Sequence, residues 1–517
     1  MNEFTAEARK NTLDKDLEKL IHVEEAASFV ARGLVAPGLG LVFLALSGIV
    51  AALFAMGEPG AVVIIAASAV GGYMALNIGA NDVANNVGPA VGAKALTMGG
   101  ALAIAAVFES AGALIAGADV VTTISSGIVD PAAMAERSVF IRLMLAALIS
   151  SALWINLATW IGAPVSTTHA VVGGVAGAGV AAAGFAAVDW TTIAGIAASW
   201  VISPVLGGIV AMVFLAFIKA NIIYRDDKIA AARLWVPILI AVMAGAFSAY
   251  LATKGLKRLI EISGLEIAIL GIGSFILVWG LAKIGIEKQA VELENRNQSL
   301  RKLFRLPLIF SAALLSFAHG ANDVSNAVGP LAAIVHAASG DPQSATVGIP
   351  LWVMVIGAFG ISLGLVLFGP KLIRMVGGQI TKLNPMRAFC VALSAAVTVI
   401  VASWFGLPVS STHIAVGAVF GVGFFREWYT ANSPRRRAYL ERKGRKARAA
   451  RARSQPAKAA AVETAGAAAV AVSREEIARR RLVRRAHVTT IATAWVTTVP
   501  ASALLAAGIF LLLRLLA

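Results

Sequence analysis

The stretch Gly79-Ala-Asn-Asp-Val-Ala-Asn-Asn-Val-Gly-Pro89 occurs twice in this chain. It returns as Gly320-Ala-Asn-Asp-Val-Ser-Asn-Ala-Val-Gly-Pro330, with nine of eleven positions identical. A second stretch, Trp160-Ile-Gly-Ala-Pro-Val-Ser-Thr-Thr-His-Ala-Val-Val-Gly173, returns as Trp404-Phe-Gly-Leu-Pro-Val-Ser-Ser-Thr-His-Ile-Ala-Val-Gly417, with nine of fourteen identical. The two offsets are 241 and 244 residues, so the stretches keep their separation. The chain therefore contains an internal duplication.

Composition places both copies in a membrane protein. The 517 residues are 58% hydrophobic and only 14% charged, whereas the surface of a soluble domain needs more charge. Apolar runs of about 20 residues, enough to span lipid, recur along the chain. Duplicated halves with breaks in matching places are typical of secondary transporters. We therefore predict an all-α integral membrane protein, a polytopic helical bundle with two inverted repeats and broken or re-entrant helices at the midplane.

Charge and hydropathy divide the chain into seven segments. We predict, in order, a cytoplasmic N-terminal arm (1–33), an extra N-terminal transmembrane helix (34–57), transmembrane repeat 1 (58–220), connecting transmembrane helices with cytoplasmic loops (221–305), transmembrane repeat 2 (306–425), a basic and partly disordered cytoplasmic insert (426–487) and a last transmembrane helix that completes repeat 2 (488–517).

The insert explains most of the formal charge of +16, because it holds 18 Lys/Arg against 5 Asp/Glu. It lies between apolar segments, so the positive-inside rule explains it better than nucleic-acid binding does. With inverted repeats, the basic loops around Arg225 and Arg301 also fall inside. The N-terminus is then cytoplasmic and the C-terminus external. One short loop, with Lys254, Lys257 and Arg258, disagrees with this orientation.

The first repeated stretch carries acids into an apolar environment. An ionised Asp at the bilayer centre costs about 2.5–3.5 kcal/mol, and this chain has two, Asp82 and Asp323. Gly and Pro nearby free backbone carbonyls. Together with amide oxygens they make a hard oxygen site suited to Na⁺ or a proton. Helix capping by Asp and Asn is the simpler interpretation, but the duplication of the whole stretch favours a functional role. We predict cation coupling at Asn81, Asp82, Asn322 and Asp323, with Na⁺ held at Asp82 and Asp323.

The second repeated stretch has the features of an anion site. Proline stands where a helix would start, and three hydroxyl residues follow it. A helix N-terminus presents free N–H groups and a positive dipole end, and hydroxyls add neutral donors. Simple N-capping is the alternative for a single copy. We predict substrate binding by the residues Ser166, Thr167, Thr168, Ser410, Ser411 and Thr412, joined by Asn85 and Asn326.

Four other reactive residues lie in or near the apolar segments. Glu109 lies in an apolar stretch and is a further cation-coupling candidate. His169 and His413 follow the hydroxyls, but no local group orients either ring, so a structural role is favoured over a Ser/His catalytic pair. The single cysteine, Cys390, excludes a disulfide framework. We expect no enzyme activity, no catalytic residues and no cofactor.

With these motifs the sequence resembles the PiT family of inorganic phosphate transporters. The two paired blocks and Phe108-Glu109-Ser110 carry the resemblance, which covers nearly the whole chain. It implies cation-coupled phosphate uptake across the cytoplasmic (inner) membrane, by an α-helical homodimer that uses Na⁺ or H⁺. It also implies that both aspartates serve cation coupling and that the hydroxyls contact phosphate. One departure is that Arg387-Ala-Phe-Cys-Val-Ala-Leu-Ser394 lacks a glutamate that some members carry.

Three alternatives remain open from the sequence. A sulfate permease of the same fold would share every motif, although sulfate cannot donate the hydrogen bond that phosphate can. An anion channel would need a continuous wet path. An intramembrane hydrolase would use Ser166 and His169.

Overall fold

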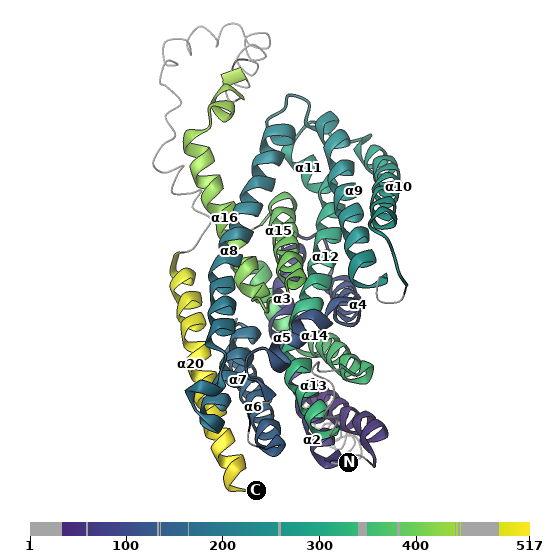
Figure 1. Cartoon of the computed structure of the whole chain (residues 1–517). Helices are drawn as coiled ribbons and strands as arrows, with labels where there is room; N and C mark the ends of the chain where they lie inside the picture. Colours follow the sequence, from purple (N-terminus) through teal and green to yellow (C-terminus); the bar gives the residue numbers. More distant parts are fainter. Residues whose placement is uncertain are drawn as a thin grey trace, which may run out of the picture.

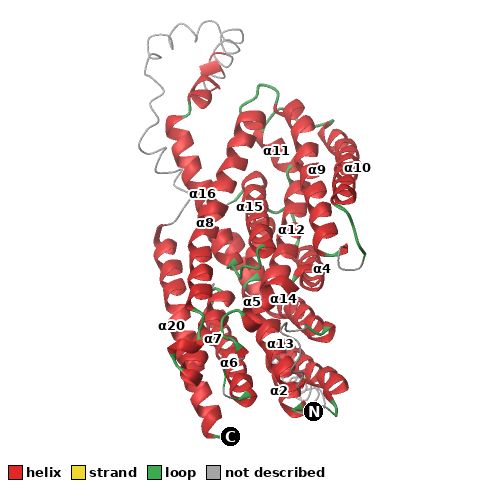
Figure 2. Cartoon of the chain, in the orientation of Figure 1, coloured by secondary structure: helices red, strands yellow, loops and turns green. Residues whose placement is uncertain are grey.

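The computed structural model describes residues 34–57, 60–131, 134, 136–163, 165–256, 260–339, 349–379, 383–439, 441–442, 445 and 485–516. The predicted N-terminal arm, most of the basic insert and Pro164 lie outside the described residues. The described part forms helices and no strand (Figures 1 and 2). Ten helices in it are long and apolar enough to cross a membrane, or eleven with one bent pair, and the shorter α7 is also apolar. An all-α membrane bundle is thus confirmed.

The residues assigned above to the extra N-terminal helix and to repeat 1 form the following helices. The extra helix spans Leu34–Ala55. After it come α2 (Ala61–Asn81), α3 (Val83–Gly92), α4 (Met98–Ala116), α5 (Ala118–Ser126), α6 (Arg137–Ile161), α7 (Thr167–Ala183) and α8 (Trp190–Ile218). The connecting region holds α9 (Lys228–Lys254), α10 (Gly264–Ala290) and α11 (Asn297–Leu303). The second repeat holds α12 (Arg305–Asp323), α13 (Ser325–Ser339), α14 (Leu351–Gln379), α15 (Pro385–Trp404), α16 (Ser411–Asn432) and α20 (Arg485–Leu515).

Helices of one repeat pack against helices of the other. Helix α14 packs on α2 and α4 packs on α12, while α20 packs on α7 and α16 packs on α8. Glycines permit these close approaches. A Cβ on Gly79 would lie 1.9 Å from the Ile361 carbonyl oxygen, and one on Gly320 would lie 2.1 Å from that of Glu109. Since Gly79 and Gly320 occupy equivalent motif positions, these contacts make Ile361 the counterpart of Glu109.

The same correspondence holds elsewhere in the bundle. Ser110 on α4 and Ser362 on α14 meet with their hydroxyls 2.7 Å apart. The second repeated stretch ends at Gly173 in one copy and at Gly417 in the other. A Cβ on Gly173 would lie 2.7 Å from the Val499 carbonyl oxygen, and one on Gly417 would lie 2.2 Å from that of Pro204. These contacts are those of two copies related by an approximate two-fold axis, with α20 in the position that α8 has in the first copy. The inverted orientation of the copies in a membrane stays a prediction.

Candidate functional site

Helices α7 and α16 both begin inside the protein. Each follows a turn with a left-handed glycine, Gly162 (φ 82°) or Gly406 (φ 67°). The Ser166 hydroxyl accepts a hydrogen bond from the backbone N–H of His169 (3.2 Å), and the Ser410 hydroxyl accepts one from His413 (3.3 Å). Both serines therefore cap helices. The first turns are buried, so two helix N-termini with positive dipole ends point into the protein interior.

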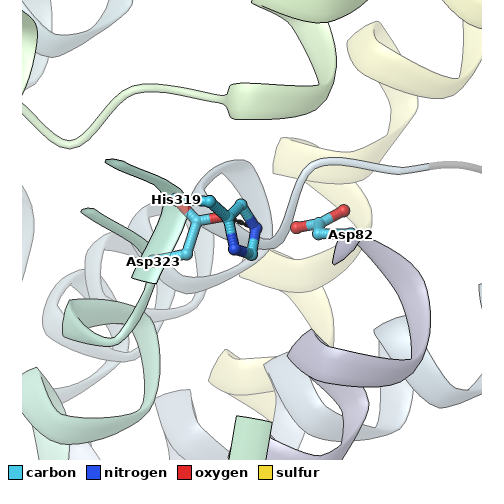
Figure 3. A group of neighbouring side chains, drawn as sticks. All are labelled: Asp82, His319 and Asp323. Atoms are coloured by element: carbon cyan, nitrogen blue, oxygen red, sulfur yellow. Dashed lines mark ion pairs between the residues drawn. The ribbon is translucent and has the colours of Figure 1, made fainter. Parts of the chain in front are cut away.

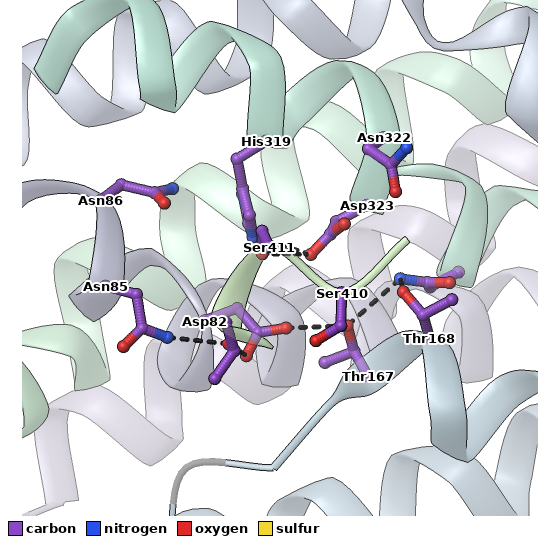
Figure 4. A network of polar contacts seen from close by, with 12 residues as sticks. Asp82, Asn85, Asn86, Thr167, Thr168, His319, Asn322, Asp323, Ser410 and Ser411 are labelled. Atoms are coloured by element: carbon purple, nitrogen blue, oxygen red, sulfur yellow. Dashed lines mark hydrogen bonds and ion pairs between the residues drawn. The ribbon is translucent and has the colours of Figure 1, made fainter. Parts of the chain in front are cut away.

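Asp82 joins these two helix starts. It lies between α2 and α3, where the helix is interrupted, and is 1% exposed. Thr167 donates a hydrogen bond to its Oδ2 (2.7 Å), and Thr412 donates one to its Oδ1 (3.0 Å). One carboxylate thus binds hydroxyls from both repeats, as Figure 4 shows for Thr167.

The motif amides make crossed contacts between the repeats. The Asn85 amide donates to the Thr412 hydroxyl (2.8 Å). Its counterpart Asn326 donates to the hydroxyls of Thr167 (3.1 Å) and Thr168 (3.2 Å). Each amide therefore binds the helix start of the other copy. The predicted substrate-binding residues of both copies are brought together in one buried network.

The second aspartate has different neighbours. Ser411 donates to Asp323 Oδ2 (3.3 Å), and His319 Nε2 lies 2.8 Å from the same oxygen. The other oxygen, Oδ1, is buried and has no hydrogen-bond donor among the described residues. Figure 3 shows Asp82, His319 and Asp323 close together, with one potential ligand atom from each within 4.8 Å of the others.

His319 also connects Glu109 to the site. Its Nδ1 lies 2.6 Å from Glu109 Oε2, and the Asn86 amide donates to Glu109 Oε1 (2.7 Å). Both Glu109 and His319 are 0% exposed. The sequence motifs did not indicate His319. Its position four residues before Asp323 puts both side chains on one face of α12 and could have identified it.

This charged connection exists in one copy only. The equivalent positions hold Ile361 for Glu109, Ile78 for His319 and Ala327 for Asn86. The two copies therefore carry hydroxyls, amides and aspartates at equivalent positions, whereas the third carboxylate and the imidazole occur in one copy.

Asn81 and Asn322 hold the turns that precede the two helix starts. The Asn81 amide donates to the Thr159 hydroxyl (2.9 Å). The Asn322 amide donates to the Ser403 hydroxyl (2.8 Å) and the Leu407 carbonyl (3.1 Å). These contacts fix the first motif against the second in each copy.

The two motif histidines pack away from the carboxylates. The rings of His169 and His413 lie edge to face, with centroids 4.4 Å apart. Each also packs against a tryptophan ring at a tilted angle, His169 against Trp200 (centroids 3.8 Å apart) and His413 against Trp495 (3.6 Å). These aromatic contacts are those expected of structural histidines, and they make the two tryptophans structural equivalents.

Three comparisons place the chain among known proteins. A family described as the phosphate transporter family matches residues 78–506. A protein of Helicobacter pylori strain J99 named "Putative phosphate permease" is 47% identical, with 96% of this chain and 98% of that protein covered. A Pyrococcus horikoshii protein of the same description is 36% identical, with 68% of this chain and 86% of that protein covered.

A solved structure named "The sodium-dependent phosphate transporter" superposes with a TM-score of 0.72 at 32% identity. The superposition covers 88% of this chain and 100% of the solved one. The family match at residues 78–506 includes every residue of the network described above. This chain therefore belongs to the phosphate transporter family.

Proposed function

We propose that the chain carries phosphate together with sodium, with Na⁺ bound at Asp82 and Asp323 and phosphate bound between the starts of α7 and α16. The family is one of transporters rather than enzymes, so phosphate transport coupled to a cation is the function of this chain. The sodium dependence in the name of the structural neighbour supports Na⁺ as the coupling ion.

The observation that carries the proposal is the charge in the buried network. Asp82, Asp323 and Glu109 contribute three carboxylates, and His319 is the one basic side chain in contact with them among the described residues. Buried charge without a partner is costly in a medium of low dielectric constant. Bound Na⁺ would neutralise the acids, and the added positive charge would favour an anion beside them. Transport of the two ions would then be coupled by electrostatics.

The donors and acceptors divide between the two ions. The free backbone N–H groups and hydroxyls at the starts of α7 and α16 suit an oxyanion. The hydroxyls of Thr167 and Thr412 donate to Asp82 in this structure, and side-chain rotation would turn them to phosphate. Asn81 and Asn322 would support cation coupling by holding the two turns in place.

Free acceptors in the network favour phosphate over sulfate. The Oδ1 atoms of Asp323 and Asn326 are buried, and neither receives a hydrogen bond from the described residues. Phosphate at neutral pH carries protons that can be donated to such acceptors, whereas sulfate carries none.

The orientation proposed from the loops also has support. Lys254, in the loop that disagreed with it, forms an ion pair with Asp119 (2.5 Å), so its charge is neutralised locally. We place this chain in the cytoplasmic membrane with its N-terminus inside and its C-terminus outside. We also propose a homodimer, which would cover part of α10, a helix whose apolar segment is only 6% buried.

The proposal is tested by uptake of radiolabelled phosphate into proteoliposomes, with Na⁺ and pH gradients imposed independently. We expect accumulation with an inward Na⁺ gradient and none with a pH gradient alone. Asp82→Asn and Asp323→Asn should each abolish Na⁺-dependent accumulation while the protein still elutes as a single species. Accumulation driven equally well without Na⁺ would refute the coupling. Excess sulfate should leave uptake unchanged, and single-channel currents would contradict a carrier.

A further inference from the structure

A strongly basic pocket lies away from the central network, at the far end of α3. Its cavity volume is about 500 Å³, within the range of small-molecule sites. Five cationic side chains line it, namely Lys94, Arg301, Lys302, Arg305 and Arg387. No acidic residue is among the described lining residues. A neighbouring pocket shares Lys302 and Arg305 and is also lined by Glu292. The other three cations, Lys94, Arg301 and Arg387, line only the first pocket, which has no acid among its described lining residues.

Arg387 indicates that an anion completes this pocket. It lies in the first turn of α15, where the helix dipole favours negative rather than positive charge. The backbone N–H of Arg387 (3.0 Å) and its Nε (3.2 Å) both donate hydrogen bonds to the Asn384 side chain. Arg387 Nη1 is buried and finds no acceptor among the described residues. A buried guanidinium donor without a partner is costly unless a ligand accepts from it.

The pocket is not part of the duplicated architecture. At the repeat offsets, Lys94 corresponds to Val335 and Arg387 to Leu143. Arg301 and Lys302 come from α11, in the connection between the repeats. Because the residues at the equivalent positions are apolar, this basic pocket is not explained as a repeat of the transport site. It lies on the side that the loop charges assign to the cytoplasm.

We propose that this pocket binds a phosphate group, either inorganic phosphate or the headgroup of an anionic phospholipid. Arginine forks match phosphate oxygens in geometry and charge. The positive end of the α15 helix dipole lies at the same pocket. Binding here does not depend on sodium, because the described lining contains no carboxylate that could hold a cation.

Lys94 allows a test that does not damage the fold. It has a left-handed backbone (φ 58°) directly after the end of α3, a conformation that Asn adopts more readily than Lys does. Lys94→Asn therefore removes the charge and relieves strain. Arg301→Gln/Arg305→Gln forms a second variant, and Lys288→Gln, an exposed cation outside the pocket lining, serves as the matched control.

The experiment has two arms, both with the full chain in nanodiscs. In the first, native mass spectrometry counts phosphatidylglycerol retained from mixed phosphatidylcholine and phosphatidylglycerol discs. In the second, equilibrium dialysis measures labelled inorganic phosphate bound in phosphatidylcholine discs in Na⁺-free buffer. We expect retention or affinity to fall about tenfold in both pocket variants and to stay unchanged in Lys288→Gln.

Loss in the lipid arm alone identifies a headgroup, loss in the phosphate arm alone identifies inorganic phosphate, and loss in both supports a site that takes either. Absence of binding in both arms would overturn the proposal. So would pocket variants that bind as well as the wild type. Because the second arm excludes Na⁺, a failed result there is distinguishable from failure of the sodium-coupled central site.

Discussion

Glu109, His319 and Asn86 form a charged connection that the second copy replaces by apolar residues. Substituting those apolar residues here should separate the structural role of the connection from its functional role. The variant is Glu109→Ile/His319→Ile/Asn86→Ala, which copies the residues found at the equivalent positions, Ile361, Ile78 and Ala327. We compare it with the single substitutions Glu109→Ile and His319→Ile. The chain already packs this apolar combination once, so its volume fits the architecture.

The expected magnitudes follow from complete burial. Glu109 and His319 are 0% exposed and 2.6 Å apart. Removing one partner of such a pair leaves a buried charge unpaired, at about 3–5 kcal/mol. The triple variant removes Glu109 together with His319, so that Asp323 is the one acid left without its basic neighbour. For a chain of this length about 1 kcal/mol corresponds to about 1 °C. We therefore expect His319→Ile, which leaves both Glu109 and Asp323 without a basic neighbour, to melt about 3–5 °C below the wild type. The triple variant should melt between these two. Glu109→Ile should have a smaller effect than His319→Ile, because His319 keeps its contact with Asp323.

The assay is thermal unfolding of detergent-purified protein followed by tryptophan fluorescence, with phosphate uptake measured on the same preparations. All three variants should lose Na⁺-dependent uptake. A His319→Ile variant as stable as the wild type would refute the ion-pair reasoning. A triple variant less stable than His319→Ile would refute the equivalence of the two positions. Full uptake by the triple variant would show that Glu109 has no part in coupling.

Three further predictions use the same preparations. Gly320→Ala should lower the melting temperature by several degrees, because its Cβ would lie 2.1 Å from a carbonyl oxygen, whereas Gly285→Ala, with nothing within 4 Å, should not; equal effects would contradict close α4–α12 packing. Asn85→Ala and Asn326→Ala should raise the KM for phosphate by similar factors of about tenfold, since each removes donors to the helix start of the other copy; a large effect of only one would contradict the crossed symmetry. Outside the spans, the backbone N–H of Thr192 donates a hydrogen bond to Asp189 and holds the pKa of its carboxyl below the ordinary value. Asp189 should therefore stabilise α8 above the ordinary carboxyl pKa, and this stabilisation should be lost as the pH falls through the lowered pKa. Melting curves measured against pH should show this dependence in the wild type and lack it in Asp189→Asn.

Much of the site follows from the sequence because its motifs are duplicated. The repeats predict two broken helices, two helix starts and their shared location, and the structure gathers Asp82, Asp323 and the hydroxyl residues in one network. Helix starts marked by Ser166 and Ser410 are local features, and local capping chemistry determines them. Their prediction needs no knowledge of the tertiary structure.

Two features could not be predicted in this way. Comparing the repeats conceals His319, because its counterpart is Ile78 and the position lies just outside the repeated block. The crossed pairing of Asn85 with Thr412 and of Asn326 with Thr168 depends on which copy supplies each neighbouring helix. Motif spacing is identical whether partners come from the same copy or the other, so only tertiary packing decides between them.

The crossed packing also determines where the site lies in the bundle. Helices α2, α4, α12 and α14 pack in cross-repeat pairs, and α7, α8, α16 and α20 do the same. The first motif begins at the ends of α2 and α12, in one group, and continues into α3 and α13, which pack on helices of that group. The second motif begins α7 and α16, in the other group. The bonds from Thr167 and Thr412 to Asp82, from Asn85 to Thr412, and from Asn326 to Thr167 all cross between the groups. Each group contains both repeats, so a displacement of one against the other would open both half-sites at once. An ion that replaces these bonds by its own contacts would therefore act on both half-sites together, which is what coupled binding of a cation and an anion requires.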